Sequence, residues 1–378
     1  MINGPSSVRP APSGKRKNNT LTLTLIIVGI LIALFVFATQ VYTEVLWFNQ
    51  LGFGNVFVTE NLVKIVLFCV GTLLIALPLW ASIRYALKHA DPQAQTTSRP
   101  RTTHQRPQQF DAQGNPIPQR PQDPFVELQD MFNQNLNRYR KAGDSLSKTL
   151  TWVVPLIVGV FLASSLMTQW KTVLLFFNGV DFGQTDPEFN KDIGFYVFNL
   201  PFWNLLTGFL SSAIVISAIG AIVVHYFNGG IKVLDRGVET TRHFKRHIAV
   251  LIALFIVVRG VRYWLERYTA IQSQSGRWAG AMYTDVNAII PTRAILAIAA
   301  VLVAALFIYA AVSHQWRLPL IGTAVLLITS LVVGGIYPWI VQRFQVTPNE
   351  QAYENEYIQR NIDMTRAAYG LDKIETSD

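Results

Sequence analysis

The sequence is 378 residues long, and 51% of its residues are hydrophobic but only 15% are charged. An ordinary soluble domain carries about 25% charged residues, so this composition excludes a typical soluble domain and favours a membrane protein. The net charge of +9 would suggest a nucleic-acid partner in a soluble protein, but here we expect none. The single cysteine, Cys69, excludes an internal disulfide and a thiolate-rich zinc site.

Seven apolar stretches are long enough to cross a hydrocarbon core of about 30 Å, which takes about 20 helical residues. They cover residues 21–41, 56–85, 152–177, 202–226, 248–268, 289–312 and 318–341. The first follows Lys15, Arg16 and Lys17, but it is too long for a signal peptide and lacks a cleavage site, which indicates an uncleaved anchor. The sequence therefore predicts an all-α membrane protein with about seven transmembrane helices.

The distribution of basic residues predicts the orientation of these helices. Twenty of the 32 Lys and Arg residues lie in the N-terminal segment and in the loops that follow the second, fourth and sixth stretches. Positive residues concentrate on the cytoplasmic side of membrane proteins. We therefore expect a multi-pass protein of the bacterial plasma membrane, with a cytoplasmic N-terminus and an extracytoplasmic C-terminus.

Six segments follow from this pattern. We expect a basic cytoplasmic N-terminus at 1–20, helices 1 and 2 within 21–90, a disordered loop at 91–124, an interfacial helix at 125–150, helices 3–7 within 151–341 and an extracytoplasmic tail at 342–378. The loop is rich in proline and glutamine and cannot bury a core. In the tail, Pro348 and Asn349 are typical of a helix start.

Two basic, amphipathic segments are expected at the inner membrane surface. Segment 125–150 repeats apolar residues at steps of three and four, which predicts a helix lying on the membrane or packed under the bundle. Segment 231–246 has a similar mixture and is interpreted as a second interfacial helix. Anionic lipid head groups are the expected partners of both segments. The expected lipid contacts are Arg138, Arg140, Lys141, Lys232, Arg236, Lys245 and Arg246.

Charged residues within the apolar stretches form the candidate site. An ionisable side chain costs about 2.5–3.5 kcal/mol at the centre of a membrane helix, so it is a functional candidate. On the fifth stretch the spacing of Arg259, Arg262 and Glu266 places all three on one helix face. The expected cluster for an anionic ligand or lipid head group is Lys64, Arg259, Arg262 and Arg293, with Glu60, Glu266 and Asp285 as charge partners. The alternative is that each arginine reaches the outer interface or pairs with a helix neighbour, and only fixes the packing.

A metal site is not expected. Glu239, His243 and His247 are spaced i, i+4 and i+8, so the first and last would stand about 12 Å apart along a helix, too far to share an ion. The basic residues around the two histidines would also repel a cation. No cofactor or catalytic motif is recognisable, and Glu266 and Asp285 are the best candidates for an enzymatic group.

Four separated motifs resemble one family. They are EVLWFNQLGFGNVFVTE, DPEFNKDIGFYVFNLPFW, GAMYTDVNA, and the tail RFQVTPNE with YIQRNIDMTRAAYGLD. The sequence resembles the uncharacterised protein family 0182, large bacterial membrane proteins frequent in actinobacteria. The resemblance implies about seven helices followed by a long extracytoplasmic domain, of which we expect only the first helix within these 378 residues, and it supplies no catalytic residue.

The sequence thus favours a non-enzymatic role. The first hypothesis is a scaffold or accessory subunit of a cell-envelope complex, with other membrane proteins as partners. The alternative is a transporter or lipid-handling protein that uses the charged cluster. The absence of an evident inverted repeat speaks against a transporter.

Overall fold

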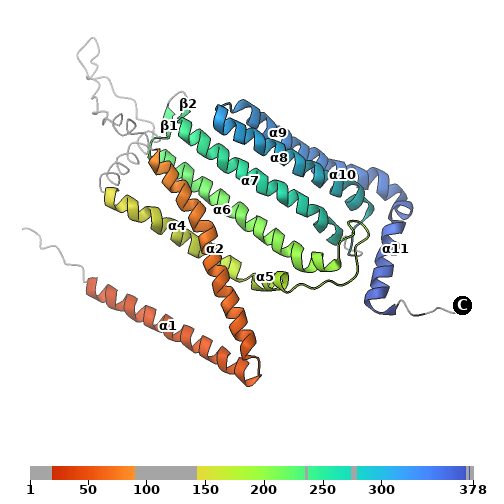
Figure 1. Cartoon of the computed structure of the whole chain (residues 1–378), viewed down its shortest axis with the longest axis horizontal. Coiled ribbons are helices and arrows are strands. Elements are labelled where there is room, and N and C mark those ends of the chain that lie inside the picture. Colours follow the sequence, from red (N-terminus) through yellow and green to blue (C-terminus); the bar gives the residue numbers. More distant parts are fainter. Residues whose placement is uncertain (1–18, 90–142, 235–236, 274–278, 372–373, 375–378) are drawn as a thin grey trace, which may run out of the picture. The chain divides into compact units, whose positions relative to one another are not determined.

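The computed structural model describes residues 19–89, 143–234, 237–273, 279–371 and 374. Its helices are α1 (Asn19–Gln50), α2 (Gly54–Lys88), α4 (Gly143–Met167), α5 (Trp170–Phe177), α6 (Leu200–Phe227), α7 (Arg242–Thr269), α8 (Ile290–Ser313), α9 (Arg317–Leu331), α10 (Tyr337–Ile340) and α11 (Glu350–Ala368) (Figure 1). Within these residues, six helices are long and apolar enough to cross a membrane, and a bent pair makes a seventh. The predicted number of spanning helices is therefore confirmed.

The bent pair replaces the third predicted helix. Helices α4 and α5 meet at an angle of 65° between Met167 and Trp170, whereas the sequence showed one apolar stretch across both. At the other end, α4 begins at Gly143 and so includes the last residues of the expected interfacial helix. The rest of that helix and the proline-rich loop lie outside the described residues.

The chain divides into two units, Met1–Val63 and Lys64–Asp378, within α2. In the first unit α1 exposes large apolar side chains along its length, such as Leu25, Leu31 and Phe35. A helix that is apolar on all sides is suited to lipid rather than to one packed face.

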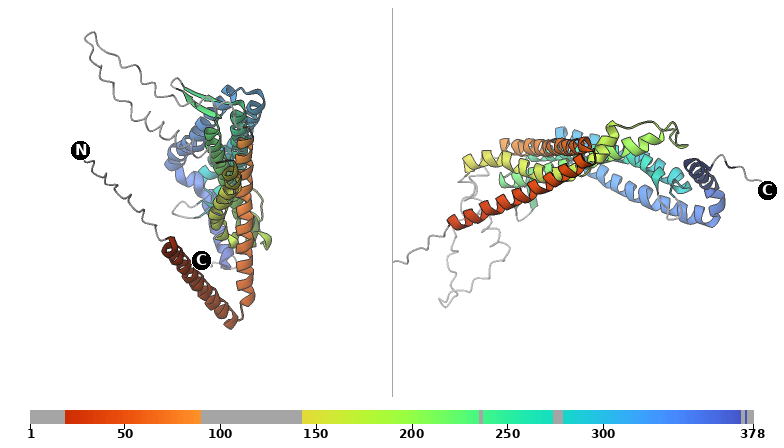
Figure 2. Two further views of the ribbon diagram at one scale, coloured as in Figure 1. Left: turned by 90° about the vertical axis from the view of Figure 1, so that its left-hand side faces the viewer. Right: turned by 90° about the horizontal axis from the view of Figure 1, so that it is seen from below.

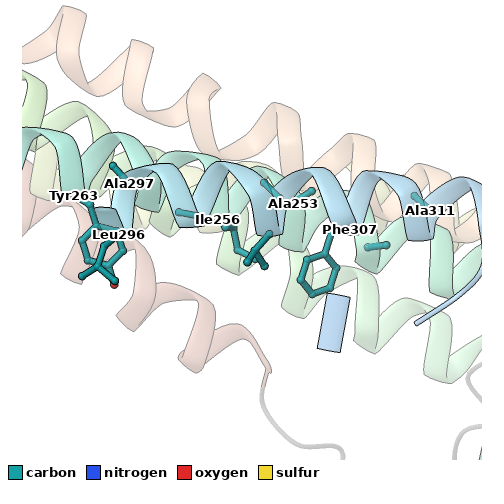
Figure 3. Close-up of a cluster of buried hydrophobic side chains, with 11 residues drawn as sticks. Ala253, Ile256, Tyr263, Leu296, Ala297, Phe307 and Ala311 are labelled. Carbon is teal, nitrogen blue, oxygen red and sulfur yellow. The ribbon is translucent and has the colours of Figure 1, made fainter. Parts of the chain in front are cut away.

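In the second unit α6, α7, α8 and α9 lie side by side (Figure 1). The main core lies between α7 and α8, where Ala253 and Ile256 meet Ala297 and Phe307 (Figure 3). Small residues let membrane helices approach closely. Gly260 shows how close: a Cβ atom there would lie 3.2 Å from the Cβ of Ala300.

Close approach also joins α2 to its neighbours. A Cβ atom on Gly159 of α4 would lie 2.8 Å from the backbone oxygen of Thr72, and one on Gly220 of α6 would lie 2.5 Å from a Leu79 methyl group. The second half of α2 therefore packs closely against both α4 and α6, and at Gly159 the neighbouring atom belongs to the backbone and leaves no room for a side chain.

A short antiparallel hairpin occupies part of the second expected interfacial helix, which is a correction. Strands β1 (Ile231–Leu234) and β2 (Gly237–Thr240) pair with Ile231 opposite Thr240. Gly229, with a φ of 74°, follows α6, and β-branched residues such as Val233 and Val238 favour strands over helix. Helix α7 then starts after Thr241, whose Oγ accepts the N–H of Phe244.

The hairpin and α11 mark opposite ends of the second unit (Figure 2); we call them the hairpin end and the α11 end. At the α11 end, the predicted helix start is confirmed, because α11 begins at Glu350 with Asn349 as its N-cap. The buried Glu354 accepts the N–H of Tyr283 at 3.1 Å, and Tyr353 packs on the Tyr283 ring. The tail therefore packs on the loop that precedes α8.

The loop before α6 is folded around two aspartates. Asp186 accepts the hydroxyl of Tyr196 at 2.8 Å. The backbone N–H of Phe182, with those of Gly194 and Gly183, holds the pKa of Asp192 below its usual value. These bonds give the loop a defined shape without a regular element.

Candidate functional site

The centre of the candidate site is the carboxylate of Glu266, which three arginines share. On α7, Arg259 Nη1 lies 3.3 Å and Arg262 Nε 3.6 Å from Glu266 Oε1. From α8, Arg293 Nη1 lies 3.2 Å from Glu266 Oε2. We call these four residues the arginine cluster. Three positive charges against one negative charge leave it with an excess of about two positive charges at neutral pH.

Helix geometry and one close helix contact assemble this cluster. Residues three, four and seven positions apart share a face of a helix, which brings Arg259 and Arg262 to Glu266. Arg293 belongs to another helix and reaches Glu266 because α7 and α8 run close together past Gly260 and Ala300. The contact across the helices could not be deduced from spacing along the chain.

An aromatic ring forms one wall of the cluster. The guanidinium carbon of Arg259 lies 4.4 Å, and that of Arg293 5.8 Å, from the ring centroid of Tyr263. The Tyr263 hydroxyl in turn lies 3.4 Å from Ser330 Oγ on α9. Cation–π contacts of this kind contribute about 0.5–2 kcal/mol, so the buried tyrosine positions two of the three guanidinium groups.

The guanidinium groups keep hydrogen-bonding capacity and access. Among the pairs described, only Arg259 also makes a hydrogen bond to Glu266, and Glu266 Oε2 is buried without one. Each guanidinium carries five N–H donors. The side chains of Arg262 and Arg259 are 46% and 37% exposed. The cluster can therefore offer charged donors to an oxyanion without first breaking every existing contact.

The other three members of the predicted cluster are used differently. Lys64 Nζ lies 5.8 Å from the Trp170 ring centroid. Asp285 accepts the Ser273 hydroxyl at 2.7 Å and the Met282 N–H at 3.0 Å, so it closes the loop before α8. Glu60 belongs to the first unit. The structure thus brings together Arg259, Arg262, Arg293 and Glu266, and their role in binding stays a prediction.

The predicted inner lipid contacts are described only in part. Arg138, Arg140, Lys141 and Arg236 and the side chain of Lys232 lie outside the described residues. Lys245 and Arg246 lie in the first turns of α7 at the hairpin end, where Arg246 is exposed. Their contact with lipid stays a prediction.

A histidine group at the hairpin end was only half visible in the sequence. His243 and His247 of α7 lie beside His89, which directly follows α2, and His225 of α6. Sequence reasoning missed His89 and His225, although the predicted topology places the end of the second helix, the end of the fourth and the start of the fifth on one membrane side. Within the described residues, no group of three or more histidine, cysteine or acidic side chains is arranged to hold a metal ion.

Comparison with known sequences identifies the family of this chain. The sequence pattern of the uncharacterised protein family UPF0182 matches residues 21–378. The chain belongs to this family. UPF0182 proteins of Kocuria rhizophila and an Arthrobacter species are 46% and 45% identical to it over 380 and 371 residues. A third, from Leifsonia xyli, is 36% identical over 364 residues.

These alignments cover 96–100% of this chain but only 33–35% of the three relatives. This UPF0182 chain therefore spans about a third of the length of the relatives it matches. No solved structure matches it. The family has no characterised activity, so function has to be argued from the arginine cluster itself.

Proposed function

We propose that this UPF0182 chain is a multi-pass plasma-membrane protein whose arginine cluster binds an anionic lipid head group. One observation carries the proposal: three guanidinium groups share the single carboxylate of Glu266. Uncompensated charge within a membrane helix is costly. A phosphate oxyanion would neutralise the excess and accept charge-assisted, bidentate hydrogen bonds from arginine.

A lipid is favoured over a free anion by the surroundings of the cluster. Val261 and Trp264 of α7, which lie within two residues of Arg262, are exposed. Exposed tryptophan is enriched at the membrane–water interface, where lipid head groups lie. About eleven apolar residues separate the start of the apolar stretch from Arg259, or ~16 Å of helix. The predicted orientation places this depth in the outer half of the membrane.

Lipid retention tests the proposal. The purified chain in nanodiscs would be compared with the double variant Arg259→Gln/Arg262→Gln for phosphatidylglycerol retained after exchange into phosphatidylcholine. Each lost charge-assisted bond is worth about 1.5–3 kcal/mol, so we expect retention to fall at least about tenfold per arginine. Inorganic phosphate in excess should not displace the lipid, and displacement would identify a free-anion site instead.

Arg267→Gln is the matched control for charge. Arg267 is on the same helix, but its guanidinium lies over the rings of Trp264 and Phe189 at 4.2 and 5.3 Å rather than on Glu266. This variant should retain phosphatidylglycerol as the unchanged chain does. Equal retention by the double variant and the unchanged chain would remove the proposal.

A scaffold or accessory role is the second candidate, and α11 favours it. One side of this helix packs on Tyr283, but Ile362, Met364 and Tyr369 are exposed. In this role, a protein partner would cover these exposed apolar side chains. Stoichiometric co-purification of another envelope protein in mild detergent, lost in Ile362→Glu/Met364→Glu but retained in Gln359→Glu, would support this role. Purification of the unchanged chain alone would contradict it.

A further inference from the structure

The histidine group at the hairpin end contains a continuous hydrogen-bonded chain across three helices. His225 Nε2 on α6 lies 3.3 Å from His247 Nδ1 on α7. His247 Nε2 lies 3.2 Å from Ser82 Oγ on α2, and Ser82 Oγ donates to the backbone oxygen of Ser217 on α6 at 2.8 Å. The chain therefore begins and ends on α6 and passes through α7 and α2.

The Ser217 carbonyl determines where the protons lie. A carbonyl oxygen only accepts, so the Ser82 hydroxyl donates to it and must accept from His247 Nε2–H. His247 Nδ1 then has no proton and accepts from His225 Nε2–H. In the neutral pair both imidazoles are therefore Nε2–H tautomers, and the bond made by one ring nitrogen sets the state of the other.

This arrangement leaves one nitrogen without a partner. His225 is completely buried, and its Nδ1 has no hydrogen-bond partner among the described residues. Gly230 closes the space beside it, since a Cβ atom at this position would lie 2.9 Å from His225 Nδ1. A proton added to His225 Nδ1 would therefore create a buried cation whose N–H has no acceptor, which is costly.

A proton added to His247 meets a different obstacle. Its free position is Nδ1, which faces the N–H of His225 at 3.3 Å, so two N–H groups would point at each other. The bond between the two rings survives this protonation only if His225 moves its own proton to Nδ1, which has no acceptor among the described residues. Every protonated form of the intact chain therefore combines a buried charge with a buried N–H that lacks an acceptor. Protonation of the pair thus weakens the contact between α2, α6 and α7.

The titratable groups around the two histidines are mostly basic, so they would not stabilise an added positive charge. From α2, Tyr85 packs on His247 and His89, and His89 stacks on His243 of α7 at 4.3 Å. From α6, the ring of Tyr226 is exposed beside Phe227. At the hairpin end, the charged groups of these elements are Arg84 and Lys88 on α2, Arg242, Lys245 and Arg246 on α7, and the exposed Glu239 on β2. Between described residues, no ion pair joins a carboxylate to these histidines.

We propose that His225 and His247 form a proton-operated latch, in which the neutral pair holds α2, α6 and α7 together and its protonation releases them. The exposed His243 and the partly exposed His89 lie beside the pair at the hairpin end but outside its chain of hydrogen bonds. An unperturbed imidazole titrates near pH 6.5. The latch would therefore open when the pH falls below this value. The arginine cluster takes no part in this response.

Distance measurement between α6 and α7 tests the latch. In the full chain with Cys69→Ser, spin labels would be placed at Ile222→Cys and Val250→Cys, both exposed positions. Between about pH 7.5 and about pH 5, on either side of the imidazole value, the distance distribution should widen. With His225→Gln/His247→Gln, which keeps polar groups that cannot be protonated, the distribution should stay narrow at both pH values.

His243→Gln is the matched control, because this exposed ring lies outside the hydrogen-bonded chain. In this variant, the distance distribution between the two spin labels should widen on acidification, as it does in the labelled chain. An unchanged distribution in the labelled chain on acidification, or equal widening in the double variant, would overturn the proposal.

A second measurement does not depend on the double variant folding. Nitrogen-15 spectra of histidine-labelled chain should show two neutral Nε2–H imidazoles at neutral pH. Their signals would be assigned by loss in His225→Gln and His247→Gln separately. An Nδ1–H tautomer or an imidazolium at either position would contradict the proton placement on which the latch rests.

Discussion

Glu266 is the residue on which the arginine cluster depends. Its carboxylate faces Arg259, Arg262 and Arg293 within 3.6 Å, so Glu266→Gln would leave three guanidinium groups without a counter-charge. Loss of one partner of a fully buried pair costs about 3–5 kcal/mol. The cost here should be lower, about 1–3 kcal/mol, because solvent reaches the arginine side chains. Thermal unfolding in detergent should show the lower stability.

Glu356→Gln provides the comparison for this variant. Glu356 also pairs with an arginine, Arg360 on α11, but its side chain is 67% exposed. Exposed pairs contribute about 0–1 kcal/mol, so this variant should unfold close to the unchanged chain. If the two variants lose the same stability, the contribution of Glu266 to stability is no larger than that of an exposed ion pair.

The individual residues show where sequence reasoning succeeds. The contacts of Arg259 and Arg262 with Glu266 follow from helical spacing, so they could be predicted. Arg293 joins them from another helix, and its contact depends on the relative position of α7 and α8 along their axes. Asp285 was predicted as a charge partner, but nearby Ser273 and Met282 bind its carboxylate. Local hydrogen-bond donors outcompete distant charges, and a sequence does not display them.

At the scale of helices, glycine contacts set the spacing of the bundle. A Cβ atom on Gly159 would lie 2.8 Å from the backbone oxygen of Thr72, and a backbone atom cannot move aside without displacing α2. Gly159→Ala should therefore destabilise the packing of α4 on α2 by about 1–3 kcal/mol, the usual cost of overpacking. Unfolding of the detergent-solubilised chain would measure it.

Gly335→Ala makes the same chemical change without the contact. Nothing lies within 4 Å of a Cβ atom placed on Gly335, and replacing a helical glycine by alanine stabilises slightly where there is room. The free energy of unfolding should therefore stay equal or rise. A loss as large as that of Gly159→Ala would mean that helix flexibility, rather than close approach, is responsible.

The helices themselves were predictable because one physical quantity determines them. A stretch of about 20 apolar residues forms a spanning helix almost regardless of which apolar residues it contains and in what order. Every predicted span contains a helix. The hairpin at Ile231–Thr240 was missed because its basic residues and apolar residues also fit an amphipathic helix. Gly229, Gly230 and the β-branched residues that follow were the available signal. The bend between α4 and α5 has no proline or glycine at the break and left no such signal.

For the molecule as a whole, orientation decides what each proposed site can meet. The arginine cluster lies toward the α11 end and the proposed histidine latch at the hairpin end, so in a membrane-spanning bundle we expect the two sites toward opposite sides of the membrane. With an inward N-terminus, the cluster meets lipids of the outer leaflet and the latch reads cytoplasmic pH. The reverse orientation exchanges these environments.

Cysteine labelling in intact cells measures this orientation. In the Cys69→Ser background, Gln359→Cys on α11 and Gln315→Cys between α8 and α9 place single thiols at exposed positions of opposite ends. The concentration of basic residues around the hairpin end predicts that this end is cytoplasmic. A membrane-impermeant maleimide should therefore label Gln359→Cys in intact cells and Gln315→Cys only after permeabilisation. The opposite pattern would reverse the orientation, and labelling of both in intact cells would contradict a bundle that spans the membrane.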